Sequence, residues 1–161
     1  MKEEDKKLFK RLALWCSRQE RSYREVTQKL ETLDASYESI LLIAKALQDQ
    51  NFQNDVRFAQ AFSGGKFRIK HWGKMKIRKA LQEKGISPEN IILGLKEIDL
   101  DDYYKIAEKL IEKKLVLLQG EKPLVREAKI YKYMNTKGYE SSLVREILTD
   151  LQRTFGKEFT T

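Results

Sequence analysis

Apolar side chains recur at three- and four-residue steps along most of the chain, which is the spacing of helices that bury one face. In the first segment Leu8, Leu12 and Cys16 follow this spacing, with lysine and arginine between them. The pattern stops in the polar residues 18–21. It predicts an amphipathic helix over roughly the first fifteen residues.

Two further helices follow in the first cycle of this pattern. Ser22 to Glu25 spells S-x-x-E, a capping box in which the serine oxygen and the glutamate each accept a backbone N–H at the start of a helix. Residues 34–36 break that helix. The apolar run 40–47 then predicts a third helix that ends near Asp49.

The same order then repeats in a second cycle. Asn54 or Asp55 can cap a helix, and Gly73 precedes the next one. Ser87 and Pro88 open another, because serine at the cap and proline in the first turn favour a helix start.

A third cycle has matching signals. Asp101 or Asp102 is the predicted cap of its first helix, and Pro123 marks the start of its second. Gly85 and Gly138 are predicted to end the middle helices of the second and third cycles, since glycine favours the left-handed conformation that follows a helix.

Superposing the cycles brings Val26, Ile77 and Ile130 to one position, and Asp34 stands where the later cycles have glycine. The repeat is about fifty residues long. We therefore expect an all-α fold of tandem three-helix repeats, three in number, that form an elongated, curved array. The predicted repeats are residues 1–52, 53–99 and 100–161. A single globule of six to nine helices is the alternative.

The composition limits which partners the protein can bind and which cellular compartment suits it. The chain has 161 residues and a formal charge of +8, which attracts nucleic acid or acidic protein surfaces, although a basic balance can also serve solubility alone. Its single cysteine, Cys16, excludes an intramolecular disulfide and favours a reducing interior. No segment is long and apolar enough to span a membrane, and the charged N-terminus has no signal-peptide core. We expect a cytoplasmic protein with no membrane partner.

Few residues could carry catalysis. His71, the only histidine, stands in a lysine-rich stretch far along the chain from Cys16, so neither has a partner for nucleophilic chemistry. Gly64-Gly65-Lys66 lacks the first glycine and the Ser or Thr of a phosphate-binding loop. Three aspartates between positions 99 and 102 lack the turn glycine of a calcium loop and are better explained as helix caps. We expect no enzyme, no cofactor and no metal.

The most informative stretch is residues 66–84, which carries eight lysines and arginines against one acid, Glu83. Phe67, His71 and Trp72 are interleaved with them. Cations beside flat rings suit an anionic surface, because the charges neutralise phosphate or carboxylate while rings can stack. We predict that the basic residues bind, and that Phe67 and Trp72 pack in the core. A second basic and aromatic group at 113–137 is mixed with glutamates, so pairing between helix neighbours explains it better.

Residues 54–62 spell NDVRFAQAF, residues 66–68 KFR, residues 72–73 WG, and residues 77–86 IRKALQEKGI. This order resembles the central repeat of the RecX family: an acidic residue before Arg-Phe-Ala, an Arg/Lys-rich segment, Trp-Gly, and Ile-Arg-x-x-Leu-x-x-Lys-Gly-Ile. The first and third repeats agree more loosely. Departures are Asp34 in place of a repeat glycine, Gly64-Gly65 at a position that is often more helical, and the tail 159–161.

The resemblance implies a non-enzymatic regulator of homologous recombination, DNA repair and the SOS response. Such a protein lodges in the helical groove of the RecA filament on single-stranded DNA and inhibits ATP hydrolysis and strand exchange. RecA is the expected partner, single-stranded DNA a second one, and the expected state is a monomer. The candidate residues for contact with RecA or DNA are Arg57, Lys66, Arg68, Lys70, Trp72, Lys74, Lys76, Arg78 and Lys79.

Two other classes remain open from the sequence. One is a helical-repeat nucleic-acid-binding protein that acts on DNA directly, whose affinity for bare DNA would fall steeply with salt because phosphate contacts release counterions. The other is an enzyme that uses Cys16 or His71.

Overall fold

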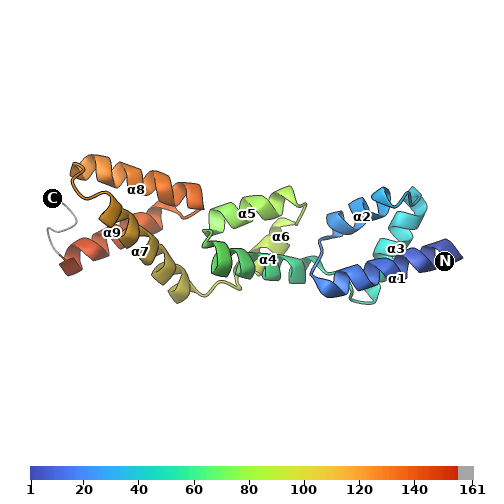
Figure 1. Cartoon of the computed structure of the whole chain (residues 1–161). Coiled ribbons are helices and arrows are strands. Elements are labelled where there is room, and N and C mark those ends of the chain that lie inside the picture. The colour runs from blue at the N-terminus through green and yellow to red at the C-terminus, as the bar shows by residue number, and fades with distance from the viewer. Residues whose placement is uncertain (156–161) are drawn as a thin grey trace. The chain divides into compact units, whose positions relative to one another are not determined.

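A computed structural model describes residues 1–155 of the chain, and within that range the secondary structure is entirely helical (Figure 1). The last six residues of the predicted third repeat, including the tail 159–161, lie outside the described residues. The helices are α1 (Glu3–Arg18), α2 (Tyr23–Thr32), α3 (Tyr37–Asp49), α4 (Asp55–Lys70), α5 (Lys74–Glu83), α6 (Pro88–Leu95), α7 (Leu100–Leu117), α8 (Pro123–Lys137) and α9 (Ser141–Phe155).

Helix starts follow local chemistry that the sequence already displays. The Ser22 hydroxyl accepts the N–H of Glu25 at 3.1 Å, and the Glu25 carboxylate accepts the N–H of Ser22 at 3.1 Å. Asn54 caps α4 by accepting the N–H of Arg57 at 3.0 Å. The capping box and this cap are therefore confirmed.

The predicted start of α7 lies two or three residues too far along the chain. Asp99, not Asp101 or Asp102, is the cap, and its carboxylate accepts the N–H of Asp102 at 3.0 Å. Asp101 and Asp102 lie in the first turn, where negative charge stabilises the positive end of the helix dipole. Because all three residues suit a helix start, composition alone could not choose among them.

The turns that end the second helix of each cycle share a left-handed backbone. The φ angle is +60° at Asp34, +78° at Gly85 and +97° at Gly138. Glycine adopts this conformation without strain, and aspartate tolerates it better than most residues. Asp34 therefore keeps the turn that glycine makes elsewhere. Gly64 and Gly65 lie inside α4, so that departure does not interrupt the helix.

The first of two compact units comprises Met1–Phe62 and Ala80–Leu95. Within it α1 and α2 pack against α3. The side chains at the centre of this packing are almost fully buried: Leu12, Val26, Leu30, Ile43 and Leu47. In the same unit a Cβ atom on Gly94 of α6 would lie 2.7 Å from the Cβ of Ala59 on α4, so glycine allows these helices to touch.

The second unit comprises Ser63–Lys79 and the described residues from Lys96 onward. Its helices α7, α8 and α9 pack against one another. Aromatic rings join the end of α4 to this group, with ring centroids 5.8 Å apart between Phe67 and Tyr103 and 5.0 Å apart between Tyr103 and Tyr139. Tyr139 has no exposed surface. Across the described residues no helix is long and apolar enough to cross a membrane.

Candidate functional site

Residues 66–79 of the basic stretch occupy the end of α4, a turn at 71–73 and the start of α5, and they lie within the second unit. We call residues 66–79 the basic segment. Lys66, Trp72 and Lys74 are half-buried. Five of its cations are exposed and form no ion pair within residues 1–155: Arg68, Lys70, Lys76, Arg78 and Lys79. Their charges are therefore available to an anionic partner.

Two lysines of the basic segment lie over the ring of Trp72. The Nζ atoms of Lys66 and Lys76 are 4.8 Å and 4.5 Å from the centroid of its ring. The prediction that both aromatic residues pack in the core is confirmed for Phe67, which is 6% exposed, and wrong for Trp72, which is half-buried. The tryptophan keeps an accessible part, and two lysine ammonium groups lie close enough to its ring for cation–π contact.

The start of α5 is fixed to the C-terminal end of α8 by its backbone. The N–H of Gly73 donates to the carbonyl of Lys137 at 2.8 Å, and the N–H of Met75 donates to the carbonyl of Gly138 at 2.9 Å. These amides would otherwise lack partners at a helix start. Because these two amides are already paired within the protein, they are not available to an anion at this segment.

Two tyrosines complete this attachment. The Tyr103 hydroxyl accepts the N–H of Lys74 at 2.9 Å and donates to the Glu140 carboxylate at 2.8 Å. The Tyr139 hydroxyl donates to the carbonyl of His71 at 2.9 Å. Burial is the largest cause that raises the pKa of both phenols, so they stay neutral donors across physiological pH. The basic segment is thus held on a rigid support.

A pocket adjoins the basic segment where α4 faces α7. It is a hollow of about 260 Å³ lined by Phe67, Arg68, Asp102, Lys105, Ile106 and Lys109. The four residues from α7 are spaced at three, one and three positions, so they share one face of that helix. Sequence reasoning missed Lys105 and Lys109, because a charged face at helical spacing usually points to solvent and only the fold places this one beside Arg68.

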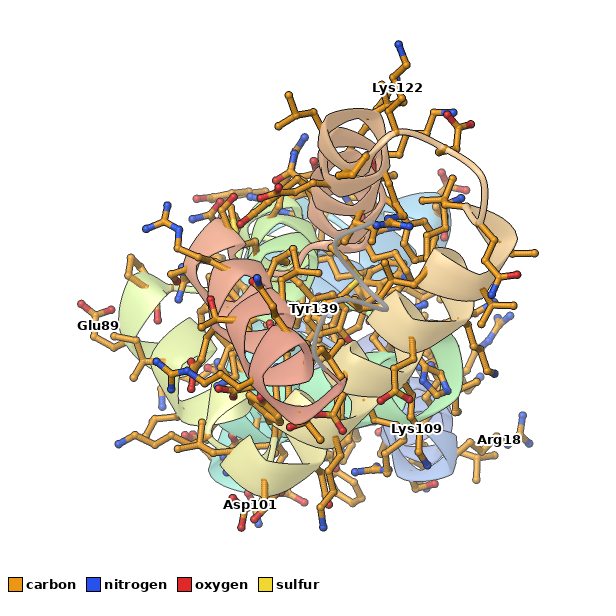
Figure 2. All side chains as sticks on the ribbon, turned by 90° about the vertical axis from the view of Figure 1, so that its left-hand side faces the viewer. Arg18, Glu89, Asp101, Lys109, Lys122 and Tyr139 are labelled. Atoms are coloured by element: carbon orange, nitrogen blue, oxygen red, sulfur yellow. The ribbon has the colours of Figure 1, made fainter. Side chains whose placement is uncertain are left out.

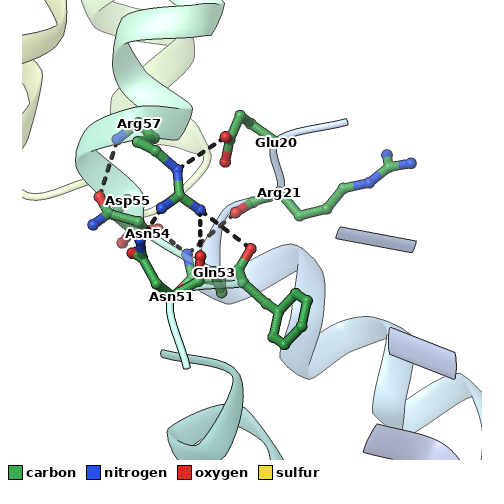
Figure 3. Close-up of polar contacts among 8 residues, drawn as sticks. Glu20, Arg21, Asn51, Gln53, Asn54, Asp55 and Arg57 are labelled. Atoms are coloured by element: carbon green, nitrogen blue, oxygen red, sulfur yellow. Dashed lines mark hydrogen bonds and ion pairs between the residues drawn. The ribbon is translucent and has the colours of Figure 1, made fainter. Parts of the chain in front are cut away.

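Arg57, the remaining candidate, lies in the first unit and is engaged in a polar cluster (Figure 3). Its guanidinium donates to the Glu20 carboxylate at 2.9 Å and to the side chain and carbonyl of Asn51 at 2.7 and 2.9 Å. A planar guanidinium can satisfy several acceptors at once. The geometry gives Arg57 a role in joining the loop after α1 to the loop before α4.

The same cluster fixes the start of α2. The Asp55 carboxylate accepts the N–H of Tyr23 at 2.9 Å and the side-chain N–H of Gln53 at 2.9 Å, and Gln53 also donates to the carbonyl of Arg21 at 3.2 Å. Asp55 therefore ties the beginnings of α2 and α4 together. This explains physically why an acidic residue precedes Arg-Phe-Ala in this sequence.

Cys16 and His71, the two residues considered for catalysis, are in different surroundings. Cys16 is 5% exposed, and burial raises the pKa of its thiol to about 11 against a smaller lowering by Arg21. His71 is half-buried in the turn before α5, in the left-handed conformation with φ of +56°. Among residues 1–155 no group of three His, Cys, Asp or Glu side chains could hold a metal ion.

The helices and turns described above place the chain in the class of all-α proteins built from helical repeats. Two family models match the chain, "RecX, second three-helix domain" at residues 54–92 and "RecX, third three-helix domain" at residues 101–148. The regulatory protein RecX of Chlorobium phaeobacteroides is 34% identical over 152 residues, which are 93% of this chain and 97% of that one. The chain belongs to the RecX family.

Other relatives agree with this assignment. The regulatory protein RecX of Oceanobacillus iheyensis is 26% identical over 134 residues, and the match covers 83% of this chain but 49% of that longer one. The crystal structure of RecX from Lactobacillus salivarius has a TM-score of 0.87 over 95% of this chain at 22% identity. That structure supports the fold alone.

Proposed function

We propose that this protein binds the RecA nucleoprotein filament and inhibits its ATPase and strand-exchange activities, which modulates recombination and DNA repair. Membership of a family of regulatory proteins supports a regulatory role. The observation that carries the mode of action is the set of exposed, unpaired cations on the basic segment. Such a surface attracts acidic protein and phosphate alike, and both are features of a nucleoprotein filament.

The support beneath the basic segment favours a binding role over simple solubility. Lysines that serve solubility alone need no fixed backbone. Here the backbone at the start of α5 is held by hydrogen bonds from its amides and by hydrogen bonds to two tyrosine hydroxyls. Preorganised charges lose less conformational entropy when a partner binds. The protein acts in this proposal as a non-catalytic, cytoplasmic monomer, and its three predicted repeats, residues 1–52, 53–99 and 100–161, form one row along the filament.

Direct action on DNA is a second candidate function, favoured by the close approach of Lys66 and Lys76 to the ring of Trp72. A flat ring flanked by cations is common in grooves that bind single strands. In this case the effect on RecA would arise by competition for the strand. A steep salt dependence of binding to bare DNA would identify it.

Charge reversal tests the main proposal. The double variant Lys76→Glu, Arg78→Glu should bind preassembled RecA filaments at least about a hundredfold more weakly, since each of the two charged contacts contributes roughly 1.5–3 kcal/mol. The matched control is Lys10→Glu, Arg11→Glu, two exposed cations of α1. Equal filament affinity of both double variants, with unchanged helicity, would remove the basic segment from the interface.

A further inference from the structure

The pocket between α4 and α7 has the composition of an anion site with an apolar floor. Arg68, Lys105 and Lys109 supply three cations around it, and Asp102 supplies one carboxylate. None of these four side chains forms an ion pair with another residue in the described part of the chain. Three unpaired cations around one hollow repel each other, so an anion bound among them is stabilised.

The floor distinguishes this hollow from an ordinary basic surface. Phe67 and Ile106 also line the pocket; Ile106 is half-buried and Phe67 is 6% exposed, so most of the apolar surface comes from Ile106 and the edge of Phe67 adds a little. A ligand that fits therefore carries a negative group and an apolar or flat part side by side. The volume of about 260 Å³ lies just below the roughly 300–1,000 Å³ of pockets that take drug-sized ligands, which suits one nucleotide unit.

The spacing of the cations matches a strand better than an isolated ion. Lys105 and Lys109 are four residues apart on α7, which sets them about 6 Å apart along the helix axis. That step is comparable to the distance between successive phosphates of an extended strand. Arg68 faces them from α4, and its planar guanidinium can bind one phosphate through two donors.

We propose that this pocket binds one nucleotide unit of a single-stranded nucleic acid, with its phosphates held by Arg68, Lys105 and Lys109 and its sugar or base against Phe67 and Ile106. This deepens the proposed function by assigning a contact for the single strand. Phosphate outweighs acidic protein as the ligand because the apolar floor has no counterpart in a carboxylate side chain, whereas every nucleotide offers a sugar and a flat base.

Gly64 controls the position of Arg68. A Cβ atom at Gly64 would lie 2.7 Å from one terminal nitrogen of the Arg68 guanidinium, which therefore folds back over the glycine. An alanine at this position must push the guanidinium away, which costs little because the side chain is flexible. The neighbouring Gly65 has open space around it and provides a matched control.

Direct binding of a fluorescent oligothymidylate to the full chain, without RecA, tests the proposal. Lys105→Glu and Lys109→Glu should each weaken binding by about tenfold, the equivalent of one charged hydrogen bond. Each should also lower the log–log salt slope by about 0.7. The control Lys122→Glu makes the same change in net charge at an exposed residue at the start of α8, well away from Lys109 (Figure 2). It should bind like the unmodified protein.

Asp102→Asn keeps the test decisive if the lysine variants fold poorly. Removing this carboxylate takes away repulsion toward phosphate, so the affinity should rise, a change that unfolding cannot produce. Gly64→Ala should change the affinity and Gly65→Ala should not. Unchanged affinity in Lys105→Glu, Lys109→Glu and Asp102→Asn alike would overturn the proposal. The proposal would also be overturned if polyglutamate displaced the oligonucleotide as effectively as unlabelled oligothymidylate does, since the pocket would then accept carboxylates as well as phosphates. Filament inhibition is measured separately, so either idea can fail alone.

Discussion

Gly73 and Gly138 approach so closely that a Cβ atom on Gly73 would lie 2.3 Å from the carbonyl carbon of Gly138. No side chain fits there, since the obstacle is backbone and cannot rotate away. The contact brings the start of α5 onto the end of α8 and allows the N–H of Gly73 to reach the carbonyl of Lys137. The position of the basic segment therefore depends on two glycines that lie far apart in the sequence.

Gly73→Ala should accordingly lower the free energy of unfolding by about 1–3 kcal/mol or more, as overpacking does. Gly65→Ala is the matched control, because Gly65 is helical with open space around it and alanine should raise stability by roughly 0.5–1 kcal/mol. Urea unfolding followed by circular dichroism measures both. Equal stability of the two variants would mean that the close approach does not exist in solution.

The tyrosine hydroxyls predict a stability change at alkaline pH. Burial raises the pKa of Tyr139 above its ordinary value of about 10, so the folded state keeps a proton that the unfolded state releases there. The contribution of this raised pKa to the free energy of unfolding is therefore fully present below about pH 10 and is lost as the pH rises through the pKa of the folded state. Tyr139→Phe should be less stable at neutral pH, having lost the hydrogen bond to His71, and should show a shallower alkaline decline.

Urea titrations from about pH 8 to about pH 11 would compare the two proteins. Tyr23→Phe serves as the control, because Tyr23 is a half-buried tyrosine in the other unit. The stability of this variant should fall with rising pH in the same way as that of the unmodified protein. A decline in Tyr139→Phe as steep as in the unmodified protein would show that this phenol does not set the alkaline limit.

Arg57 should behave as a structural residue. Arg57→Ala removes donors to Glu20 and to Asn51 and should cost roughly 1–3 kcal/mol of the free energy of unfolding. Arg57→Lys should recover only part of this, since a single ammonium cannot reach the same acceptors. Arg18→Ala, at an exposed position of α1, should change stability by less than about 0.5 kcal/mol. If Arg57→Ala kept its stability but lost filament binding, Arg57 would instead be a contact residue.

Cys16 should be chemically inert in the folded protein. Burial raises the pKa of its thiol to about 11, so the reactive thiolate is scarce at neutral pH. A thiol reagent such as iodoacetamide should modify Cys16 in urea and react far more slowly in buffer. Rapid modification of the native protein would show an accessible thiolate and would reopen a redox or nucleophilic role.

Local signals in the sequence predicted much of the fold. The capping box at Ser22, the cap at Asn54 and the terminator at Gly138 each act within one helical turn, so their residue types alone identify them. The same signals could not separate Asp99 from Asp101 and Asp102, because all of them favour the start of a helix.

The candidate site was predictable only in part. The density of lysine and arginine identified the basic segment, but charge patterning does not show which side chains are already engaged, as Arg57 is with Glu20. The pocket residue Lys105 and the contact between Gly73 and Gly138 depend on segments that only tertiary packing brings together. Tertiary contacts of this kind leave no periodic signal in one sequence.

The most direct test of the central claim is DNA-stimulated ATP hydrolysis by preassembled RecA filaments, titrated with this protein below RecA stoichiometry and repeated with added single-stranded DNA. The proposed function predicts inhibition that persists when free DNA is added, because the filament itself is the target. Rescue by free DNA would instead identify a protein that acts on nucleic acid. An ATPase rate that does not change at any concentration of the protein would contradict the proposed inhibition of RecA.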